Sequence, residues 1–413
     1  MEWIKDRKEL SESARVPVKS WCAEPEPEAL KQAANLAAHP VVEHHVALMP
    51  DCHVGYGMPI GGVIGCREAV IPNAVGVDIG CGMCAVKTSA TVEQMRDLAF
   101  IRAILEDVKK LVPVGEGNSH KRQQEWDGFA SFESSIERDV PAWFNQDGLN
   151  HDRKNLGTLG GGNHFIEVQA SEDGTVWLML HSGSRNLGHR IASFYHRLAQ
   201  QLNQRWHADL PSPDLAFLPL ETGEGQGYVR DMTFALAYAL ENRRRMMAAA
   251  KSVMAEHLPG IGFVEEINIH HNYAKLEHHF GRNLWVHRKG ATSAREGELG
   301  IIPGSMGTPS YIVRGRGNPE SFMSCSHGAG RSMGRTEASR RLTLEECDRA
   351  MQGVVYDRWH KAGGGSKKRR EKGIDYDFGE APQAYKDIDQ VIAAELDLIE
   401  PLVKLRPLGV IKG

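Results

Sequence analysis

Residues 77–83, VDIGCGM, place a carboxylate and a thiol close together in a glycine-rich loop. Glycine neighbours weaken packing and order around a side chain, so a cysteine in this setting is poorly suited to a structural role. A tight turn does not need a cysteine either. The pattern therefore indicates that Asp78 and Cys81 are two anionic ligands on one loop.

Four further motifs place a histidine at or beside a predicted strand end, next to small residues. They are GGGNHFIE with Asn163, His164 and Glu167, LHSGSR with His181, INIHHNYAK with His270, His271 and Asn272, and SCSHGAGR with His327. A single histidine near a strand is more often a hydrogen-bonded structural residue. Several in the same setting, together with an aspartate and a cysteine in a glycine loop, are hard to assign separately to packing.

Other histidines have a different context. The pairs His44–His45 and His278–His279 lie in polar, helix-like sequence, and we expect them to be solvated. Asp51 and His53 are intermediate: we expect them to line the site without binding a metal directly.

The ligand chemistry favours more than one ion. Thiolate is a soft ligand, imidazole is borderline and carboxylate is hard. One cysteine, one aspartate and three histidines exceed the four ligands of a closed tetrahedral zinc site. With a thiolate able to bridge, they suggest two ions roughly 3.5–4 Å apart. The spacing matches no zinc-finger or zincin pattern, so the residue types carry this inference.

Glycine-rich turns are candidate phosphate sites. The chain has neither G-x-x-x-x-G-K-[ST] nor G-x-G-x-x-G in a Rossmann setting. PGSMG (303–307) and HGAGR (327–331) can still offer backbone N–H groups to phosphate oxygens, although either alone is more often an ordinary tight turn. Arg331 near His327 makes the second motif the better phosphate candidate.

The composition excludes several classes of protein. The 413 residues are 41% hydrophobic and 25% charged with a net charge of -4, so an RNA partner requires a local basic patch. No apolar run approaches a membrane span, and the charged start has no secretory h-region. The 7 scattered cysteines argue against a disulfide framework and favour a reduced, cytoplasmic setting.

Helix and strand patterns alternate without an interdomain linker before residue 360, which predicts one large mixed α/β unit. We expect a short helix after Pro27, strands and glycine loops over 46–88, a helix after Thr91, irregular structure over 114–158, and a long helix over 228–258. Thr343 should cap another helix, and a C-terminal helix should run from about Ile388.

Nine motifs occur together and in order: VDIGCGM, GTLGGGNHFIE, LHSGSR, HHNY, RKGATSAR, GIIPGSMG, SHGAGR, AYKDID and the terminal KG. From about residue 46 to the end, the chain resembles the RtcB family of GTP-dependent RNA ligases. The resemblance implies an α+β fold with central, mostly antiparallel sheets surrounded by helices, forming a single ligase domain over 1–413. The first 20 or so residues and the basic segment 361–373, expected to be a flexible loop, match least.

The resemblance also implies a reaction. Such ligases join an RNA 3′-phosphate or 2′,3′-cyclic phosphate end to a 5′-hydroxyl end in RNA repair or tRNA splicing, using GTP and two manganese ions. It assigns metal binding to Asp78, Cys81, His164, His181 and His271, with Cys81 bridging both ions, and covalent attachment of GMP to His327.

The resemblance assigns GTP contacts to a larger set. These are Asn163, His164, Phe165, Ile166, Glu167, Asn272, Pro303, Gly304, Ser305, Met306, Ser310, His327, Gly328, Ala329, Gly330, Tyr385 and Lys412. Tyr385 falls near the guanine. Because Lys412 is the penultimate residue, its assignment requires the C-terminal tail to fold back over the site.

The expected partners are GTP and RNA, with no membrane. We expect a monomer; an activating protein partner is left open. Basic residues near the motifs that could contact RNA phosphates are Arg153, Lys154, Arg185, His189 and Arg190, whereas KKRREKG is better explained as a solvated loop. Two alternatives remain open: a dinuclear metal phosphoesterase acting on RNA ends, and a non-catalytic RNA-binding or chaperone-like subunit.

Overall fold

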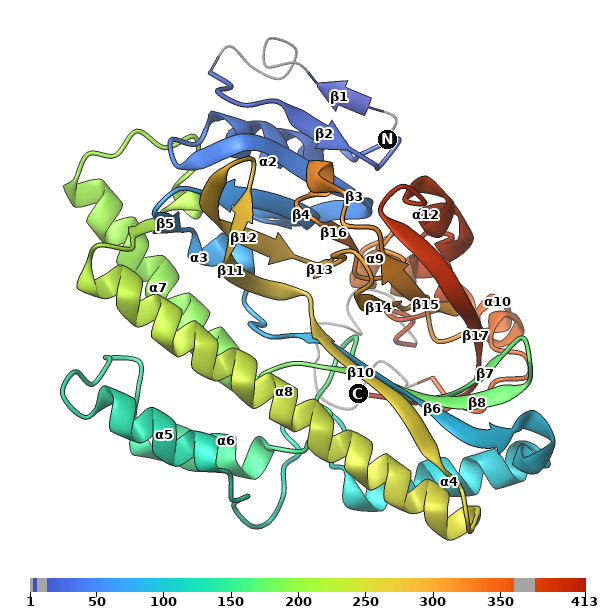
Figure 1. Ribbon diagram of the computed structural model, residues 1–413. Helices are drawn as coiled ribbons and strands as arrows, with labels where there is room; N and C mark the ends of the chain where they lie inside the picture. Colours follow the sequence, from blue (N-terminus) through green and yellow to red (C-terminus); the bar gives the residue numbers. More distant parts are fainter. Residues whose placement is uncertain (1–2, 6–12, 360–375) are drawn as a thin grey trace.

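The computed structural model describes residues 3–5, 13–359 and 376–413, so the predicted basic loop 361–373 lies outside the described residues. Two large, mostly antiparallel sheets form the centre, and helices cover their outer sides (Figure 1). This arrangement confirms the predicted α+β class. None of the described helices combines the length and the apolar character that crossing a bilayer requires.

The sheets draw on strands from the whole described chain. The six-stranded sheet has the order β1 (Trp3–Lys5), β2 (Val18–Ser20), β3 (Val42–Tyr56), β4 (Met58–Cys66), β12 (Arg282–Lys289) and β11 (Asn272–His279). The seven-stranded sheet has the order β10 (Phe263–His270), β6 (Gly82–Thr91), β8 (Thr175–Ser182), β7 (Phe165–Ser171), β17 (Ile399–Lys412), β15 (Ser310–Gly315) and β14 (Leu299–Ile302). Two small sheets pair β13 (Ala291–Ser293) with β16 (Ser324–Ser326), and β5 (Ala69–Val70) with β9 (Leu218–Pro219).

The described α-helices are α2 (Pro27–Ala38), α3 (Pro72–Val75), α4 (Leu98–Leu111), α5 (Asp127–Ile136), α6 (Gln146–Asn155), α7 (Asn186–Arg205), α8 (Gly223–His257), α9 (Arg335–Arg341), α10 (Leu344–Ala350) and α12 (Ile388–Ala394). Short 3₁₀ helices span Val92–Met95, Pro213–Leu215, Pro319–Ser321 and Pro382–Ala384. Helices α4 and α8 cover one face of the seven-stranded sheet, where Ile104 and Met246 pack on Leu180 in a fully buried core.

Strand register gathers the motif residues at one place. His181 on β8 is opposite Phe165 on β7 and Met83 on β6, and Lys412 on β17 is also opposite Phe165. His270 at the end of β10 is opposite Gly82 at the start of β6. Because β6 and β7 begin where β8, β10 and β17 end, side chains that are far apart in sequence meet at this edge of the sheet.

Several local predictions hold. Pro27 begins α2, α8 covers the predicted long helix, and Thr343 with Glu346 forms a capping box at α10. The capping box of Thr91 caps only the 3₁₀ helix; Asp97 caps α4, by accepting a hydrogen bond from the Phe100 amide at 2.9 Å.

One local prediction is wrong because long-range packing overrides local pattern. Residues 114–158 contain α5 and α6; the Phe132 ring of α5 stacks on Phe234 of α8, with ring centroids 3.9 Å apart. The predicted C-terminal helix begins at Ile388, as expected, and forms α12; the 14-residue strand β17 follows it. Register shifts next to Pro401 and Pro407 of β17 accommodate the missing N–H groups of these two residues.

The two histidine pairs are also a correction. They lie on strands β3 and β11 rather than in helical sequence, so alternate residues face opposite sides. His44 and His278 are exposed as expected, but His45 and His279 are buried.

A buried aspartate ties α8 to its neighbours. The Asp231 carboxylate accepts hydrogen bonds from Trp143 Nε1 at 2.7 Å and from the Tyr195 hydroxyl at 2.6 Å. Arg230 Nε donates to its other oxygen at 2.8 Å. One carboxylate therefore joins α8, α7 and the segment before α6.

We expect Asp231→Ala to lower the free energy of unfolding by about 2–4 kcal/mol, because it leaves buried donors unpaired. Urea denaturation followed by fluorescence measures the change. Asp209→Ala, at an exposed position, is the control and should shift the free energy by less than about 0.5 kcal/mol. Equal effects of both substitutions would contradict a structural role for the Asp231 network.

Candidate metal and nucleotide site

The 76–82 loop has a conformation that requires its glycines. Gly80 has a φ of 78°, in the left-handed region. A Cβ on Gly82 would lie 1.9 Å from the Ile269 carbonyl oxygen, so only glycine allows β6 to approach β10 there. The loop is closed by the Cys81 amide, which donates to the Asp78 carbonyl at 3.1 Å. This geometry aims Asp78 and Cys81 at the same point.

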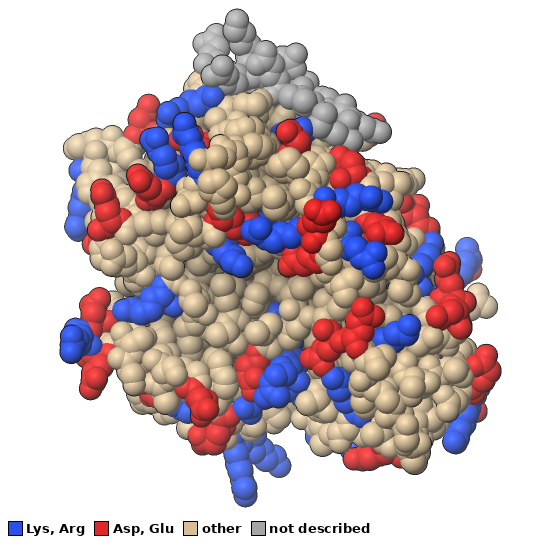
Figure 2. All heavy atoms as spheres, in the orientation of Figure 1, with Lys and Arg blue, Asp and Glu red and all other residues tan. Residues whose placement is uncertain are grey.

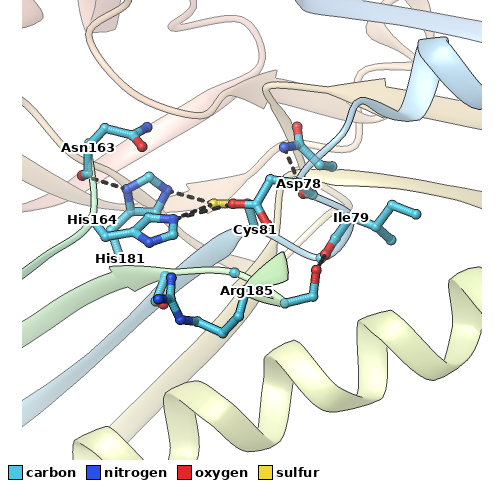
Figure 3. A network of polar contacts seen from close by, with 12 residues as sticks. Asp78, Ile79, Cys81, Asn163, His164, His181 and Arg185 are labelled. Atoms are coloured by element: carbon cyan, nitrogen blue, oxygen red, sulfur yellow. Dashed lines mark hydrogen bonds and ion pairs between the residues drawn. The ribbon is translucent and has the colours of Figure 1, made fainter. Parts of the chain in front are cut away.

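The five predicted ligands converge on that point. The Cys81 sulfur lies 3.2 Å from His181 Nε2 and 3.6 Å from His164 Nε2. His164 Nε2 is 3.3 Å from Asp78 Oδ2, and His181 Nε2 is 3.2 Å from His271 Nε2. In Figure 3 the Cys81 thiol points between the rings of His164 and His181.

The ligand atoms divide into two groups that share one sulfur. Cys81, His181 and His271 form one group, and Asp78, Cys81 and His164 form the other, with the ligand atoms of each within 4.8 Å of one another. A thiolate common to two groups is the arrangement expected of a bridging ligand between two divalent ions.

Backbone carbonyls fix the ring tautomers. His164 Nδ1 lies 2.9 Å from the Leu159 carbonyl oxygen, and His181 Nδ1 lies 3.1 Å from that of Asn163. Each Nδ1 therefore carries the proton, which leaves the Nε2 lone pair facing the cluster. Burial lowers the pKa of His181 and His271 well below the ordinary value, so both rings stay neutral and able to bind a metal.

The cluster fits divalent cations. Asp78 Oδ1 is buried and accepts no hydrogen bond from the described residues, although a buried carboxylate oxygen normally has a partner. Burial, reinforced by Asp78, raises the pKa of the Cys81 thiol well above its ordinary range, so the thiolate needs a cation to form. Facing lone pairs, an unpartnered carboxylate oxygen and a thiol together form a metal-type donor set.

Arg243 on α8 bonds the backbone of the segments that carry the cluster. The sequence patterns did not identify this residue. Its Nη1 donates to the carbonyls of Gly80 at 2.8 Å and Ser182 at 3.0 Å, and its Nη2 lies 3.1 Å from His270 Nδ1. Burial lowers the pKa of Arg243 to about 10, so it remains charged. The residue lies in ENRRRMM, where nothing distinguishes it from the neighbouring arginines.

His327 lies beside the cluster but in neither ligand group. Its ring centroid is 4.7 Å from that of His271. Asp51, fully buried on β3, accepts hydrogen bonds from His327 Nδ1 at 2.6 Å and from the His327 amide at 3.1 Å. Asp51 thus lines the site, as expected, and its carboxylate holds the Nδ1 side of the His327 ring, while Nε2 has no hydrogen-bond partner among the described residues.

The C-terminal tail folds back over the site, as the Lys412 assignment requires. Lys412 Nζ donates to the Asn163 carbonyl at 3.2 Å, forms an ion pair with Glu380 at 3.3 Å, and lies 5.4 Å from the Phe165 ring centroid. A cavity of about 370 Å³ next to it is lined by Met306, Trp359, Glu380, Lys412 and Gly413 among others.

Other predicted nucleotide residues lie on β7 and on the 303–310 turn, outside the lining of this cavity. Glu167 is buried on β7, which raises its pKa to about 7 despite nearby Lys412. Gln169 Nε2 links Glu167, at 2.6 Å, to Ser310, at 3.2 Å, and the Ser310 hydroxyl accepts a hydrogen bond from the Gly304 amide. Ser305 lies in the same turn, and its amide donates to the Thr308 hydroxyl.

Glu380 is a charged centre that the sequence patterns did not identify. The Tyr385 hydroxyl donates to Glu380, and Arg335 Nε donates to it at 2.7 Å. Burial opposes its ionisation, but Lys412 and Arg335 outweigh burial and lower the pKa of Glu380 to about 2. Tyr385 therefore lies at the cavity edge, bound to a fixed carboxylate.

Not every predicted residue has its side chain in the cavity. Ile166 packs in the core beneath the sheet, because its strand neighbours Phe165 and Glu167 take the opposite face. The Asn272 amide group is used within the fold: Nδ2 donates to the Asp78 carbonyl at 3.1 Å, and Oδ1 accepts from the Gly290 amide at 2.8 Å. Ala329 is buried beside Pro303, whose carbonyl accepts a hydrogen bond from its amide.

The predicted RNA contacts divide in the same way. Arg153 pairs with Glu133 at 3.0 Å and Arg190 with Asp152 at 2.5 Å, so both bind within the fold. Arg185 and His189 line a cavity of about 540 Å³ that also exposes Asp78 and His164.

Comparison with known proteins now defines the family. The sequence profile described as "tRNA-splicing ligase RtcB" matches residues 32–413. The chain belongs to the RtcB family.

Curated relatives cover the chain almost end to end. The RNA-splicing ligase RtcB of Escherichia coli (strain K12) is 41% identical, over 98% of this chain and 99% of that protein. The tRNA-splicing ligase RtcB of Archaeoglobus fulgidus is 32% identical (94% and 92%), and that of Nanoarchaeum equitans is 30% identical (93% and 91%). The RtcB match is thus not confined to the site motifs.

The shared sulfur leads to a prediction for metal binding by this RtcB-family chain. We expect Cys81→Ala to weaken Mn²⁺ binding at both positions, whereas His271→Ala should remove only one ion, because Cys81 belongs to both ligand groups and His271 to one. Equilibrium dialysis followed by elemental analysis measures the ions per chain.

His278→Ala is the matched control, since His278 is exposed on the strand that follows His271 and contacts Asn283. A Cys81→Ala protein that still binds the wild-type number of ions would rule out the shared thiolate.

Proposed function

We propose that the protein is a GTP- and Mn²⁺-dependent RNA ligase that joins RNA 3′-phosphate or 2′,3′-cyclic phosphate ends to 5′-hydroxyl ends. Membership of a family whose profile and relatives are named as RNA- or tRNA-splicing ligases supports RNA ligation. The observation that carries the finer proposal is a histidine outside both ligand groups, held by a buried carboxylate beside them.

In this proposal His327 is the nucleophile. Nδ1 carries the ring proton and donates a hydrogen bond to Asp51. Nε2 therefore carries the lone pair that attacks the α-phosphorus of GTP. A P–N bond forms, the bond from the α-phosphorus to the pyrophosphate oxygen breaks, and pyrophosphate leaves. The Asp51 carboxylate stabilises the positive charge that develops on the ring.

Two transfers complete the reaction. An oxygen of the RNA 3′-phosphate attacks the phosphorus on His327, the P–N bond breaks, and GMP is joined to the RNA end. The 5′-hydroxyl oxygen then attacks the 3′-phosphorus, loses its proton, and displaces GMP. A 2′,3′-cyclic end must first be hydrolysed to the 3′-phosphate.

Asp78, Cys81, His164, His181 and His271 would hold the two Mn²⁺ ions, which would neutralise phosphate charge when bound. For the nucleotide, Lys412 and Glu167 offer a cation and a carboxyl group close to the cavity beside Met306, which suits a base with both acceptors and donors. The two fixed side chains of Phe165 and Tyr385 would border the same nucleotide.

A guanylylation assay tests this function. After incubation with α-labelled GTP and Mn²⁺, we expect the wild type to carry acid-labile, covalently bound label, because a P–N bond hydrolyses in acid. His327→Ala should carry none, and Asp51→Ala should react at least about tenfold more slowly, because the ring loses its orienting carboxylate.

The same assay separates the alternatives. A dinuclear phosphoesterase would release phosphate from RNA ends and retain no label, and a non-catalytic RNA-binding subunit would do neither. Wild-type protein that never acquires label with Mn²⁺ present would refute the covalent mechanism.

For the RNA we propose a groove of about 840 Å³ lined by Arg331, Arg335, Arg340 and Arg341. Ile60 also lines it, and a Cβ on Gly290 would lie 2.3 Å from Ile60 Cγ2 and 3.0 Å from His327 Cε1, so the groove begins near His327. On the face seen in Figure 2, by contrast, basic and acidic side chains are interspersed. A local arginine cluster suits a chain whose net charge is -4.

Arg340 and Arg341 are exposed and are the last two residues of α9, so they provide the test of this groove. We expect the double variant Arg340→Ala/Arg341→Ala to bind single-stranded RNA more weakly and to reduce the slope of log K against log salt by about one, because fewer phosphates are neutralised. Fluorescence anisotropy over a salt series measures both.

The control is Arg102→Ala/Arg197→Ala, which removes the same charge from exposed positions on α4 and α7. Label transfer from GTP to His327 should persist in the Arg340→Ala/Arg341→Ala protein, because that step needs no RNA. Equal weakening by both double variants would show that only overall charge matters.

A further inference from the structure

The segment 386–395, which contains helix α12, bonds the backbone beside both halves of the Asp51–His327 pair and belongs to neither metal-ligand group. Lys386 precedes the helix and Glu395 follows it. Lys386 Nζ donates to the carbonyls of Cys52 at 2.6 Å and Pro50 at 3.3 Å. These are the residues on either side of Asp51, so Lys386 holds the strand that carries the carboxylate.

Glu395 holds the other half. Its side chain is fully buried, and its Oε2 accepts a hydrogen bond from the Ser326 amide at 2.8 Å. The next amide in the chain, that of His327, donates to Asp51 Oδ2 at 3.1 Å. Two buried carboxyl groups from distant parts of the chain, Glu395 and Asp51, therefore accept hydrogen bonds from the consecutive amides of Ser326 and His327.

The helix between these contacts is itself firmly placed. Ile388 and Val391 of α12 are buried in the same core cluster as Cys325 and Ala329, which flank the His327 segment. The Lys386 amide also donates to the Gly330 carbonyl at 3.0 Å. The two contacts thus belong to one rigid element.

We propose that residues 386–395 form a clamp that sets the distance and angle between the Asp51 carboxylate and the His327 ring, with Lys386 and Glu395 as positioning residues. This inference rests on the proposed function, in which His327 is the nucleophile. The pair is short, 2.6 Å from Nδ1 to Oδ2, and the two residues are 276 positions apart, so local chain stiffness cannot maintain it.

The chemistry of Glu395 agrees with this role. Burial raises the pKa of Glu395 well above the ordinary value, which favours the neutral carboxylic acid. A neutral acid can accept the Ser326 N–H through its carbonyl oxygen without adding a second negative charge near Asp51. Glutamine has the same carbonyl oxygen in the same place, whereas alanine has none.

Single-turnover guanylylation tests the clamp. We expect Lys386→Met and Glu395→Ala to slow label transfer by about tenfold to a hundredfold, with the apparent Kd for GTP changed by less than about threefold, because a misplaced nucleophile affects the chemical step. Glu395→Gln should recover most of the rate lost in Glu395→Ala. Lys110→Met, which removes an exposed ion pair with Asp107 within α4, should react at the wild-type rate.

A double-mutant cycle separates positioning from general destabilisation. In an Asp51→Ala background, Lys386→Met and Glu395→Ala should each slow label transfer by less than about threefold, since the pair they position is already broken. Thermal melting of every variant records any loss of folded protein. Histidine ¹⁵N spectra, which need no GTP, should show one His327 tautomer in the wild type and mixed tautomers in Lys386→Met and Glu395→Ala.

Three results would overturn the clamp: wild-type rates in Lys386→Met and Glu395→Ala, equal rates in Glu395→Gln and Glu395→Ala, or rate losses that multiply fully with Asp51→Ala. Each of these results assumes that the wild-type protein forms the GMP adduct. Such a result would therefore refute the clamp and leave the ligase proposal intact. A wild type that forms no adduct refutes the ligase proposal, and with it any clamp acting on a nucleophile.

Discussion

Five metal-preferring side chains crowd one buried point of this fold, and the surrounding structure has to hold them there. Lone pairs of three imidazoles, a thiol and a carboxylate face one another within hydrogen-bond distance, an arrangement that is unfavourable unless cations lie among them. Two kinds of contact in the surrounding fold hold these side chains in place. Backbone carbonyls fix the ring protons of His164 and His181, and the buried guanidinium of Arg243 donates to the Gly80 carbonyl of the ligand loop.

The geometry separates two histidine roles that residue type cannot distinguish. His164 and His181 direct Nδ1 to backbone carbonyls and share the Cys81 sulfur, as metal ligands do. His327 directs Nδ1 to a buried carboxylate and belongs to neither ligand group found among the described residues. In the proposed function, this difference in the Nδ1 partner distinguishes the nucleophile from the metal ligands His164 and His181.

The C-terminal segment connects Lys412 with the Asp51–His327 pair. Lys386 and Glu395, on either side of α12, bond the backbone next to Asp51 and the residue before His327, and β17, which follows, carries Lys412 to Asn163 and Glu380. Within β17, Lys412 is paired with Phe165 of β7, while β15 pairs with the start of the same strand, residues 399–405. The tail is therefore part of the core as well as of the site.

Residue types and local spacing were enough to predict a mixed α/β unit, the long helix, the capping box at Thr343, and the candidate ligands, because these depend on short-range pattern and ligand chemistry; the α+β class came from the family resemblance. Only the tertiary structure decided that 399–412 is a strand, that Arg243 supports the cluster, and that Asp51 orients His327. Those contacts join residues up to 276 positions apart, and they arise from strand register and burial, which leave no local signature in the chain.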